Sequence, residues 1–460
     1  MALLDNYGDY GAGRLTSGSP GDDHGREDGR PLEGGDMTTL PTMPVDSFDL
    51  SDLEFWARPI DDREAAFRSL RQERPIAFYE EPELPETAIV MPKGPGYYAI
   101  TRYADVVEMS RHPELFCSGQ SGSTIFDMPP ELLEFFGSMI NMDDPRHARL
   151  RRIVSAAFNP RMVKSIEDSI QTVAGELVAQ VRGQGECDFV TEVAARLPLK
   201  VICDMMGVPE RDYDRVFHCS NVILSSGDPE YIAEDEDPVL AFMNAGMELA
   251  KIMEELAGYR TDHPTDDLTS ALVHGNVDGE SLTHDELESF FILLLVAGNE
   301  TTRNAISHGL WALTEHPDQR AVWAADFEGV APTAVDEIVR WASPVIFMRR
   351  TVTEPTVLSG HEFKTGDKVI LFYNSANRDE DVFEDPHRFD VTRQPNPHVG
   401  FGAAGPHFCL GAHLARREIT VMFRELFHHL PDIRATAEPD RLRSNFINGI
   451  KHLPCAYSTA

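Results

Sequence analysis

Positive charge is scarce in this chain of 460 residues, which has 41 lysines and arginines against 76 aspartates and glutamates and a formal net charge of −35. A surface this acidic repels phosphate backbones, so we expect no nucleic acid partner. Cysteine is also scarce, and six cysteines in a chain of this length form no disulfide scaffold. Their number indicates a reducing compartment, which we expect to be the cytoplasm.

Long apolar runs are missing as well. The longest one, Phe290–Gly298, is much shorter than the ~20 residues of a membrane-spanning helix. The N-terminal sequence MALLDNYGDY has no basic stretch followed by apolar residues, so it does not resemble a secretory signal. Hydrophobic residues still make up 42% of the chain, which is enough for a large core. We therefore expect a soluble globular protein with no membrane span.

The first 45 residues differ in composition from the rest. They contain nine glycines, eight acidic residues, three arginines and no lysine. Such a segment buries too little apolar surface to offset the entropy of ordering it. The sequence therefore predicts a disordered tail over residues 1–45 and one globular domain over residues 46–460, because no linker divides the remainder.

Helical patterns dominate the globular part, so the predicted fold class is mainly α with minor β. Aromatic and β-branched residues predict strands over residues 96–101 and within 345–372. Residues 374–408 are rich in Asn, Pro and Gly and should be mostly loop. We expect one long helix over Asp285–His316 and shorter helices within residues 49–73, 145–183, 190–219, 239–259, 332–341 and 409–430.

One cysteine lies in a glycine-rich loop, Phe401–Gly411 (FGAAGPHFCLG), directly before a predicted helix. A helix N-terminus favours a thiolate through its dipole and free N–H groups, and glycines let the backbone approach a flat partner closely. A thiolate at Cys409 is therefore suited to be an axial ligand of haem iron. The alternative for a single cysteine is a buried structural role, which we assign to Cys117, Cys187, Cys203, Cys219 and Cys455.

The same loop contains a G-x-G-x-x-G pattern at Gly400, Gly402 and Gly405. A dinucleotide site would need a preceding strand and a helix that opens within the motif. Residues 396–399 do not read as a strand, and Pro406 interrupts the motif. The pattern therefore does not favour a dinucleotide-binding fold.

The cysteine loop resembles the haem-binding signature of cytochromes P450, F-x-x-G-x-H/R-x-C-x-G, through its segment GPHFCLG, which contains His407, Cys409 and Gly411. It departs at the phenylalanine, because Phe401 lies eight residues before the cysteine where the family usually has seven. The resemblance covers residues 46–460. It implies the cytochrome P450 fold with a long central helix over the haem, heme b as cofactor, and Cys409 as the iron ligand beside Gly411.

The predicted long helix contains Ala297–Thr302 (AGNETT), which resembles the oxygen-activation segment of the family. The resemblance implies that Gly298 leaves room beside the haem and that Glu300 and Thr301 deliver protons during oxygen activation. A threonine hydroxyl in a helix can also bond to the carbonyl four residues earlier and open the helical ladder. The alternative is that these polar residues only line a water pocket.

Glu337-Ile-Val-Arg340 matches the E-x-x-R pattern of the family. Residues three apart share a helix face, so the two side chains can pair. The resemblance implies a buried ion triad with an arginine from a later loop, matched here by Arg388 in DPHRFD. The implied role is structural, because the triad holds the loop that carries Cys409.

Four basic residues match positions at which the family binds the haem carboxylates: His147, Arg151, Arg350 and His407. Cations suit this role because buried carboxylates need neutralising partners. Arg349 competes with Arg350, since a shift of one residue would exchange the two. For His147 alone, a capping or surface role is the alternative.

Residues 145–164 contain six arginines and lysines and no acidic residue, which is unusual in so acidic a chain. In the P450 fold this helix lies near the thiolate. The resemblance therefore implies docking of an acidic ferredoxin, reduced by an NAD(P)H-dependent reductase, through electrostatic steering. The alternative is a solvated helix face that also binds the haem carboxylates. The six bases are Arg146, Arg149, Arg151, Arg152, Arg161 and Lys164.

Several segments that would line a P450 substrate pocket are apolar, which suits a lipid-like substrate. The phrases FGSMINMDDPRH, FFILLLVAGNETTRNAI, DEIVRWASPVIFMRRT and SNFINGIKHLP also resemble an actinobacterial P450 branch. Members of that branch hydroxylate the terminal methyl carbons of methyl-branched lipids and sterol side chains. The predicted pocket residues are Met139, Ile140, Val222, Leu224, Val345, Phe347 and Phe446.

The resemblance thus implies a monomeric cytochrome P450 monooxygenase that hydroxylates an unactivated C–H bond with O2 and electrons from a ferredoxin. One alternative is a P450 that acts on another hydrophobic natural product. A peroxide-driven hydroxylase is a second, although such relatives typically lack the acid–threonine pair. The alternative outside enzymes is a haem-thiolate sensor or carrier, which would need neither a proton relay nor a donor surface.

Overall fold

The computed structural model describes residues 42–82, 93–158, 160–224, 228–233 and 235–459. Most of the predicted tail, residues 1–41, lies outside these ranges. Its last four residues are described and belong to the fold: the Met43 N–H donates to Ser69 Oγ (2.8 Å), and Met43 and Val45 pack against a cluster of buried aromatic residues. The folded region therefore begins before the predicted boundary at residue 45.

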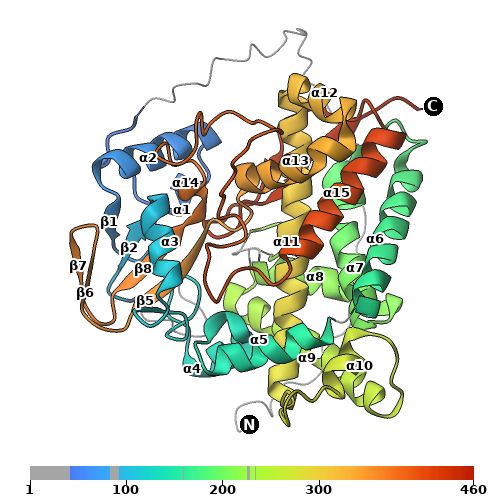
Figure 1. The fold of residues 1–460 in the computed structure, drawn as a ribbon, viewed down its shortest axis with the longest axis horizontal. Helices are drawn as coiled ribbons and strands as arrows, with labels where there is room; N and C mark the ends of the chain where they lie inside the picture. The colour runs from blue at the N-terminus through green and yellow to red at the C-terminus, as the bar shows by residue number, and fades with distance from the viewer. Residues whose placement is uncertain (1–41, 83–92, 159, 225–227, 234, 460) are drawn as a thin grey trace. The chain divides into compact units, whose positions relative to one another are not determined.

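Helices form most of the described chain (Figure 1). None within the described ranges combines the length and the hydropathy needed to cross a bilayer. Two short 3₁₀ helices are η1 (Met139–Asn141) and η3 (Glu210–Asp212), and a short π-helix is η2 (Val190–Ala194). The α-helices are α1 (Leu53–Trp56), α2 (Ile60–Glu73), α3 (Tyr103–Arg111), α4 (Pro130–Gly137), α5 (Arg146–Ala157), α6 (Pro160–Val181), α7 (Arg196–Met206), α8 (Tyr213–Leu224), α9 (Pro238–Asp262), α10 (Leu268–Val273), α11 (His284–Glu315), α12 (Pro317–Ala325), α13 (Phe327–Ala342), α14 (Tyr373–Ala376) and α15 (Ala412–His429).

The strands are short and confirm the minor β content. One five-stranded sheet has the order β1-β2-β8-β5-β3, in which β2 and β8 are parallel and the other neighbours antiparallel. Smaller sheets join β4-β12-β9, β10-β11 and β6-β7. The strands are β1 (Ile76–Tyr79), β2 (Tyr97–Ile100), β3 (Phe116–Cys117), β4 (Glu186–Asp188), β5 (Phe347–Val352), β6 (Thr356–Leu358), β7 (His361–Phe363), β8 (Lys368–Phe372), β9 (Arg434–Ala435), β10 (Asp440–Arg441), β11 (Ile450–His452) and β12 (Pro454–Ala456).

The longest described helix, α11, packs against α7, α8, α9, α13 and α15 (Figure 1). Its start is set by a capping box: Thr283 Oγ1 accepts from the Glu286 N–H (3.2 Å), and the Glu286 carboxylate accepts from the Thr283 N–H (3.0 Å). The helix predicted over Asp285–His316 is confirmed to within one residue at each end. The cap and the apolar run that follows it are both visible in the sequence.

Helix α13 begins before its predicted start at Pro332, because Asp326 Oδ1 accepts from the Gly329 N–H (3.1 Å) and caps the helix there. The prediction placed Pro332 in the first turn, a position that proline favours. Pro332 instead lies inside α13 and removes one backbone hydrogen bond. The sequence prediction also misses α12, although Pro317 occupies its first turn.

Strand β5 determines which side chains face the large cavity described below. Successive side chains of a strand point to opposite faces. Met348 and Arg350 line the cavity, whereas Phe347 is buried in an aromatic cluster and Arg349 pairs with Asp127 (2.8 Å). This alternation selects Arg350 over Arg349 as the basic residue of the cavity, and it removes Phe347 from the lining.

Candidate active site

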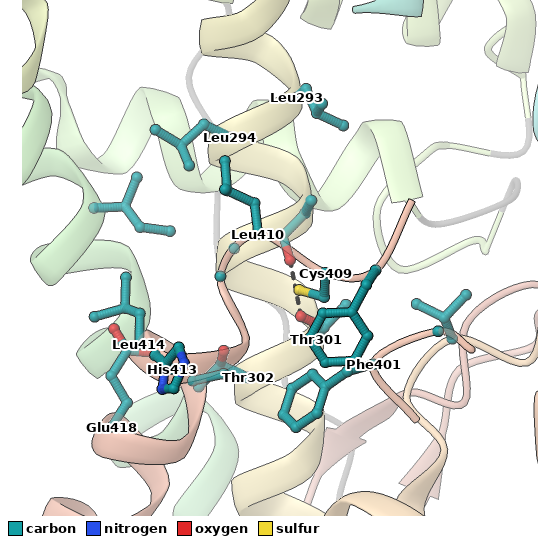
Figure 2. Close-up of a pocket in the computed structure, with 18 of the residues that line it drawn as sticks. Leu293, Leu294, Thr301, Thr302, Phe401, Cys409, Leu410, His413, Leu414 and Glu418 are labelled. Carbon is teal, nitrogen blue, oxygen red and sulfur yellow. Dashed lines mark hydrogen bonds between the residues drawn. The ribbon is translucent and has the colours of Figure 1, made fainter. Parts of the chain in front are cut away.

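A cavity of about 500 Å³ lies between α11 and the loop that carries Cys409. Its walls come mainly from α5, α6, α7, α11, β5 and α15 and are mostly apolar. In Figure 2, Thr301 of α11 lies near Cys409 and Phe401 of the loop, and Thr302 lies near His413 of α15. The predicted site residues that meet in the lining are Met139, Ile140, His147, Arg151, Gly298, Thr301, Val345, Arg350, His407, Cys409 and Gly411.

Backbone hydrogen bonds shape the cysteine loop. Gly402 has a φ of +81°, in the left-handed region that favours glycine, and its N–H donates to the Val399 carbonyl (2.9 Å). The Cys409 N–H donates back to the Phe401 carbonyl (3.0 Å). The Arg416 guanidinium lies 4.4 Å from the centre of the Phe401 ring. The phenylalanine that is shifted by one residue therefore packs against α15.

The thiol of Cys409 is accessible from the cavity, whereas the other five cysteines are buried, as predicted. Surrounding protein raises the pKa of Cys409 by desolvation, while the Gly411 N–H and the charges of Arg151 and Arg416 act to lower it. The N–H group at the helix N-terminus thus acts in the predicted direction, and desolvation acts against it. A bound metal ion deprotonates a coordinating thiol outright, so the thiolate at Cys409 depends on its metal.

The four predicted carboxylate partners all line the cavity. The His147 and His407 rings lie 4.3 Å apart. Burial, followed by the charges of Arg350, His147 and Arg151, lowers the pKa of His407 to about 3. The buried Nε2 of His147 has no hydrogen-bond partner among the residues that the structure describes. Four basic groups around one cavity, one of them with an orphaned nitrogen, fit a cofactor that carries two carboxylates.

Helix α11 presents Gly298 and Thr301 to the cavity. Thr301 Oγ1 donates to the Ala297 carbonyl four residues earlier (2.8 Å), which confirms the predicted bond to the helical ladder. A Cβ atom at Gly298 would lie 2.5 Å from Ile202 Cδ1. Glycine at this position therefore lets α11 lie close to α7, and a larger residue would require the end of the Ile202 side chain to move.

Glu300 does not line the cavity. It forms a buried ion pair with Arg303, and its Oε1 accepts from Asn304 Nδ2 (3.0 Å). Arg303 in turn donates to Asn221 Oδ1 on α8 (2.9 Å). The structure thus brings Thr301 to the cavity and keeps Glu300 in a buried polar network one residue away. The role of Glu300 in proton delivery stays a prediction.

Glu337 and Arg340 form a fully buried ion pair, with Arg340 Nε 2.7 Å from Glu337 Oε2. The third member is Arg393, whose Nε lies 3.1 Å from the same oxygen. Arg388, the predicted member, contributes only its backbone carbonyl, which accepts from Arg340 Nη2 (3.3 Å). The Arg388 assignment is wrong because both arginines lie in one irregular loop, where no periodicity indicates which side chain turns inward.

The predicted pocket residues are confirmed only in part. Met139, Ile140 and Val345 line the cavity. Phe347 points away from the cavity because side chains alternate along the strand. The Phe446 ring packs against the Phe347 ring, with the two ring centroids 5.3 Å apart. Val222 and Leu224 of α8 are not in the lining, to which α7 and α11 contribute instead. The residues wrongly placed in the lining are Val222, Leu224, Phe347 and Phe446.

Sequence reasoning missed most of the apolar wall and one buried acid, Glu418 of α15. A usable pattern was present, because Phe290, Leu294 and Ala297 precede Thr301 at spacings of three and four and so share its helix face. The missed apolar wall residues include Ile202, Met205, Phe290, Leu293 and Leu294.

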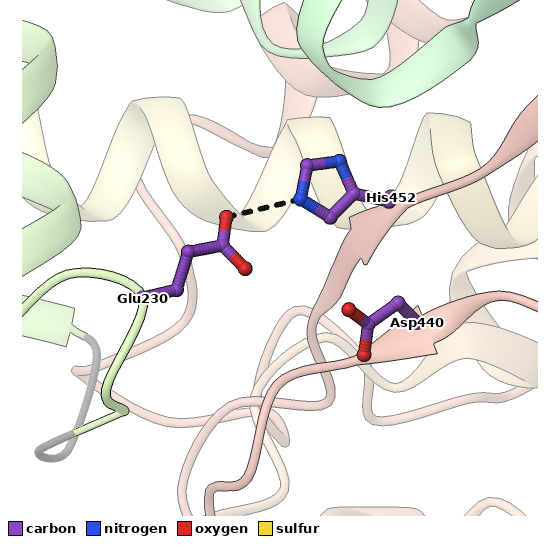
Figure 3. Close-up of side chains that lie close together, drawn as sticks. All are labelled: Glu230, Asp440 and His452. Atoms are coloured by element: carbon purple, nitrogen blue, oxygen red, sulfur yellow. Dashed lines mark hydrogen bonds and ion pairs between the residues drawn. The ribbon is translucent and has the colours of Figure 1, made fainter. Parts of the chain in front are cut away.

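Away from the cavity, Glu230, Asp440 and His452 lie close together (Figure 3). Lys451 Nζ lies 3.1 Å from Glu230 Oε2 and 3.6 Å from Asp440 Oδ2. His452 Nε2 lies 3.1 Å from Glu230 Oε1. A lysine side chain therefore already neutralises these carboxylates, and the cluster ties the segment after α8 to β11 through ion pairs.

The basic run of α5 is ion-paired within the molecule at three of its arginines, Arg146, Arg149 and Arg152. Arg149 Nη1 lies 2.9 Å from Glu286 Oε1, and Arg152 Nη1 lies 3.1 Å from Asp278 Oδ2. Glu286 belongs to the first turn of α11, and Asp278 lies in the segment before it. Acids distant in the sequence thus fold against this part of the run, so the surface there is less positive than the sequence indicates.

Comparison with known proteins agrees with this geometry. The sequence profile of the family Cytochrome P450 matches residues 330–442. The methyl-branched lipid omega-hydroxylase of Mycobacterium tuberculosis is 52% identical over 424 residues, which cover 92% of this chain and 97% of that protein. The steroid C26-monooxygenase of Mycolicibacterium smegmatis is 42% identical over 369 residues, which cover 79% of this chain and 84% of that protein.

Solved structures give the same result. A Mycobacterium marinum cytochrome P450 in complex with pseudoionone has a TM-score of 0.84 and 46% identity, and the match covers 90% of this chain and 100% of that one. A cytochrome P450 enzyme from Bacillus subtilis has a TM-score of 0.72 and 32% identity, with 85% and 98% covered.

One accessible cysteine and four bases in a single cavity form the donor set of a haem-thiolate site. With relatives this similar over most of its length, the chain belongs to the cytochrome P450 family and is a monooxygenase. The residues present fit haem: Cys409 would hold the iron, and the four bases of the cavity would hold the carboxylates.

Proposed function

We propose that this monooxygenase hydroxylates a terminal methyl carbon of a methyl-branched lipid or of a sterol-like side chain. The observation that carries the proposal is the apolar wall of the cavity, in which α11 contributes only the hydroxyls of Thr301 and Thr302 as polar side chains. Such a wall binds hydrocarbon and offers few polar groups to a sugar. The names of the 52% and 42% identical relatives support a lipid or steroid substrate.

Haem bound through Cys409 supplies oxygen activation and C–H oxidation. The chain's own residues bind the hydrocarbon, exclude water and move protons. We assign Thr301 to hold a water molecule in the cavity with the hydroxyl that is anchored at Ala297. We assign Glu300 to supply protons toward that water from its network with Arg303.

A spectral titration tests the substrate class. Substrate binding shifts the haem absorption, and elongated methyl-branched lipids or C27-type sterones should bind better than compact polar molecules. Leu294→Trp fills the cavity and should weaken this binding about tenfold or more. Leu224→Trp is the matched control, because Leu224 lies outside the lining. Tight, productive binding of a macrolide or a sugar, with no response to any branched lipid, would contradict the proposal.

The proposed electron donor is an acidic ferredoxin with an NAD(P)H-dependent reductase, docked on the face beside Cys409. Phe408 is 39% exposed, and its carbonyl accepts from Arg151 Nη2 (2.6 Å). An exposed ring beside a cation suits an interface with an apolar centre and a charged rim. Arg149 and Arg152 are ion-paired and Arg151 lines the cavity, so this proposal depends on the exposed ring of Phe408 and on the position of α5 beside the cysteine loop.

Turnover separates the monooxygenase from its alternatives. Product should form with ferredoxin, reductase, NAD(P)H and O2, and peroxide alone should not replace them. Tight lipid binding without any product would favour a carrier. We also propose a monomer in the cytoplasm, and the six free thiols support a reducing compartment.

A further inference from the structure

Two of the buried cysteines lie directly opposite each other in a sheet. In the three-stranded sheet β4-β12-β9, the antiparallel register pairs Cys187 of β4 with Cys455 of β12. Directly opposed residues of antiparallel strands place their side chains on the same face, with Cβ atoms ~4.5–5.5 Å apart. Neither cysteine lines the cavity, so the monooxygenase reaction uses neither thiol. The pair is therefore a cluster of two nucleophilic groups away from the active site.

Hydrogen bonds along the ladder fix the backbone spacing of the two cysteines. On one side of them, the Tyr457 N–H donates to the Gly185 carbonyl (3.0 Å). On the other side, the Phe189 N–H donates to the Leu453 carbonyl (3.0 Å). The cysteines lie two residues from each of these pairs, so they too form a hydrogen-bonded pair, in which the Cα atoms are ~5.5 Å apart. Because disulfides commonly join Cα atoms at this separation, the register permits a bond between the two sulfurs.

The two thiols differ in their access to solvent. Strand β4 lies at the edge of the sheet and Cys187 is 8% exposed, whereas Cys455 on the central strand is 2% exposed. Burial raises the pKa of Cys187 to about 11, although a hydrogen bond with the Tyr457 hydroxyl opposes it. The charges of Glu192 and Asp188 also raise this pKa, and burial raises the pKa of Cys455. Cys187 is therefore the thiol that a small oxidant meets first, and it reacts slowly at pH 7.

We propose that Cys187 and Cys455 form a reversible cross-strand disulfide when hydrogen peroxide, the by-product of uncoupled oxygen reduction, accumulates. The Cys187 thiolate attacks one peroxide oxygen, the O–O bond breaks, and a sulfenic acid forms as hydroxide leaves. The Cys455 thiolate then attacks the Cys187 sulfur, and a second hydroxide leaves as the S–S bond forms. The two thiol protons neutralise the two hydroxides. The pair thus loses two electrons, and one peroxide becomes two water molecules.

Cys455 is the resolving thiol in this scheme. A sulfenic acid that meets a thiol is captured as a disulfide, whereas one that stays free is oxidised further to sulfinic acid, which is irreversible. The Cβ spacing of a hydrogen-bonded pair exceeds the ~3.5–4.5 Å of a relaxed disulfide, so the bridge is strained and readily reduced. Such a bond suits a reducing compartment, in which disulfides are transient. The pair therefore protects this sheet from permanent oxidation.

Non-reducing peptide mapping of the haem-loaded protein tests the bond. After treatment with hydrogen peroxide, two peptides linked through Cys187 and Cys455 should appear, and dithiothreitol should separate them. Cys117 is the matched control and should form no link, because it is 6% exposed on the edge strand β3 but lies opposite Thr351. Absence of the linked peptides at a peroxide dose that oxidises Met247, which is 39% exposed, would overturn the proposal.

Removal of the resolving thiol tests the order of the steps. In Cys455→Ala, the sulfenic acid at Cys187 has no thiol to capture it, so dimedone should label Cys187 severalfold more than in the wild type. Longer treatment should convert Cys187 to sulfinic acid in this variant. Cys117→Ala is the control and should keep the wild-type labelling of Cys187. Equal labelling in Cys455→Ala and the wild type would overturn the role of Cys455, and the peptide map of the wild type decides the proposal even if Cys455→Ala does not fold.

Discussion

At the scale of the residue, the Cys409 sulfur determines the character of the bound haem. Cys409→Ser should abolish the reduced-CO absorption typical of thiolate-ligated haem, and turnover with it, because a neutral hydroxyl cannot donate electron density as a thiolate does. Absorption spectra of the reduced, CO-treated protein measure this. Cys117→Ser, which changes a buried cysteine outside the cavity, should keep the absorption. Retention of both spectrum and turnover in Cys409→Ser would contradict the assignment.

Thr301 and Glu300 should differ in what their loss does to the reaction. Thr301→Ala keeps the helix but removes the hydroxyl that faces the cavity, so NAD(P)H should still be consumed while oxygen leaves as peroxide. Positioned proton transfer is typically worth ~10²–10⁴-fold, so product should fall far more than cofactor consumption. Glu300→Gln should slow product formation and NAD(P)H consumption to the same extent. Peroxide and product per NAD(P)H distinguish the two, and full coupling in Thr301→Ala would refute its role.

Glu418 gives folding stability a pH dependence, because burial raises its pKa. Its pKa of about 8 in the folded protein exceeds the ~4.3 of an unfolded chain, so the folded state binds more protons between these values. The free energy of unfolding should therefore fall as the pH rises from about 4.3 to about 8. Relative to wild type, Glu418→Gln should gain stability over this window, on the order of a few kcal/mol, and no more above it. Parallel denaturation profiles at pH 5, 7 and 9 would contradict the raised pKa.

At the scale of the element, Glu337 and Arg340 tie α13 to the loop that contains Arg393. Glu337→Gln leaves buried cations without their carboxylate and should cost about 3–5 kcal/mol of stability. Arg393→Ala should lower the unfolding temperature and speed haem loss. Arg388→Ala is the control, because its side chain lies outside the ion pair. Thermal unfolding followed by haem absorbance measures both, and an equal effect of Arg388→Ala would restore the original assignment.

Elements whose causes are local could be predicted from the sequence. The long helix was found because its cap at Thr283 and its apolar run are contiguous in the chain. Positions that depend on chain segments meeting in space could not be found in this way. Arg393 replaces Arg388 through the path of an irregular loop, and Phe347 is excluded by the register of β5 against β8. The motif around Glu300 predicts a side chain at the cavity, but the ion pair with Arg303 holds Glu300 in a separate buried network.

At the scale of the whole molecule, a net charge of −35 makes an acidic partner hard to attract. Asp278→Asn combined with Glu280→Gln would free Arg152 from its two acids. Under the docking proposal, this should raise the rate of reduction by ferredoxin roughly two- to tenfold at low salt and not at high salt. Stopped-flow reduction measures it. The control changes two exposed acids of α2, Asp61→Asn with Asp62→Asn, and an equal gain there would show only an effect of net charge.

The ring of bases in the cavity has a consequence for a newly made chain. Before haem binds, the buried Nε2 of His147 has no partner among the described residues, and the cations Arg151 and Arg350 share the cavity with it. A cofactor with two carboxylates supplies partners to these groups only in the native state, so its binding stabilises folding by mass action. Chains made in a cell short of haem therefore spend longer partly open to proteases. The amount of enzyme should accordingly follow the supply of haem more closely than the rate of translation.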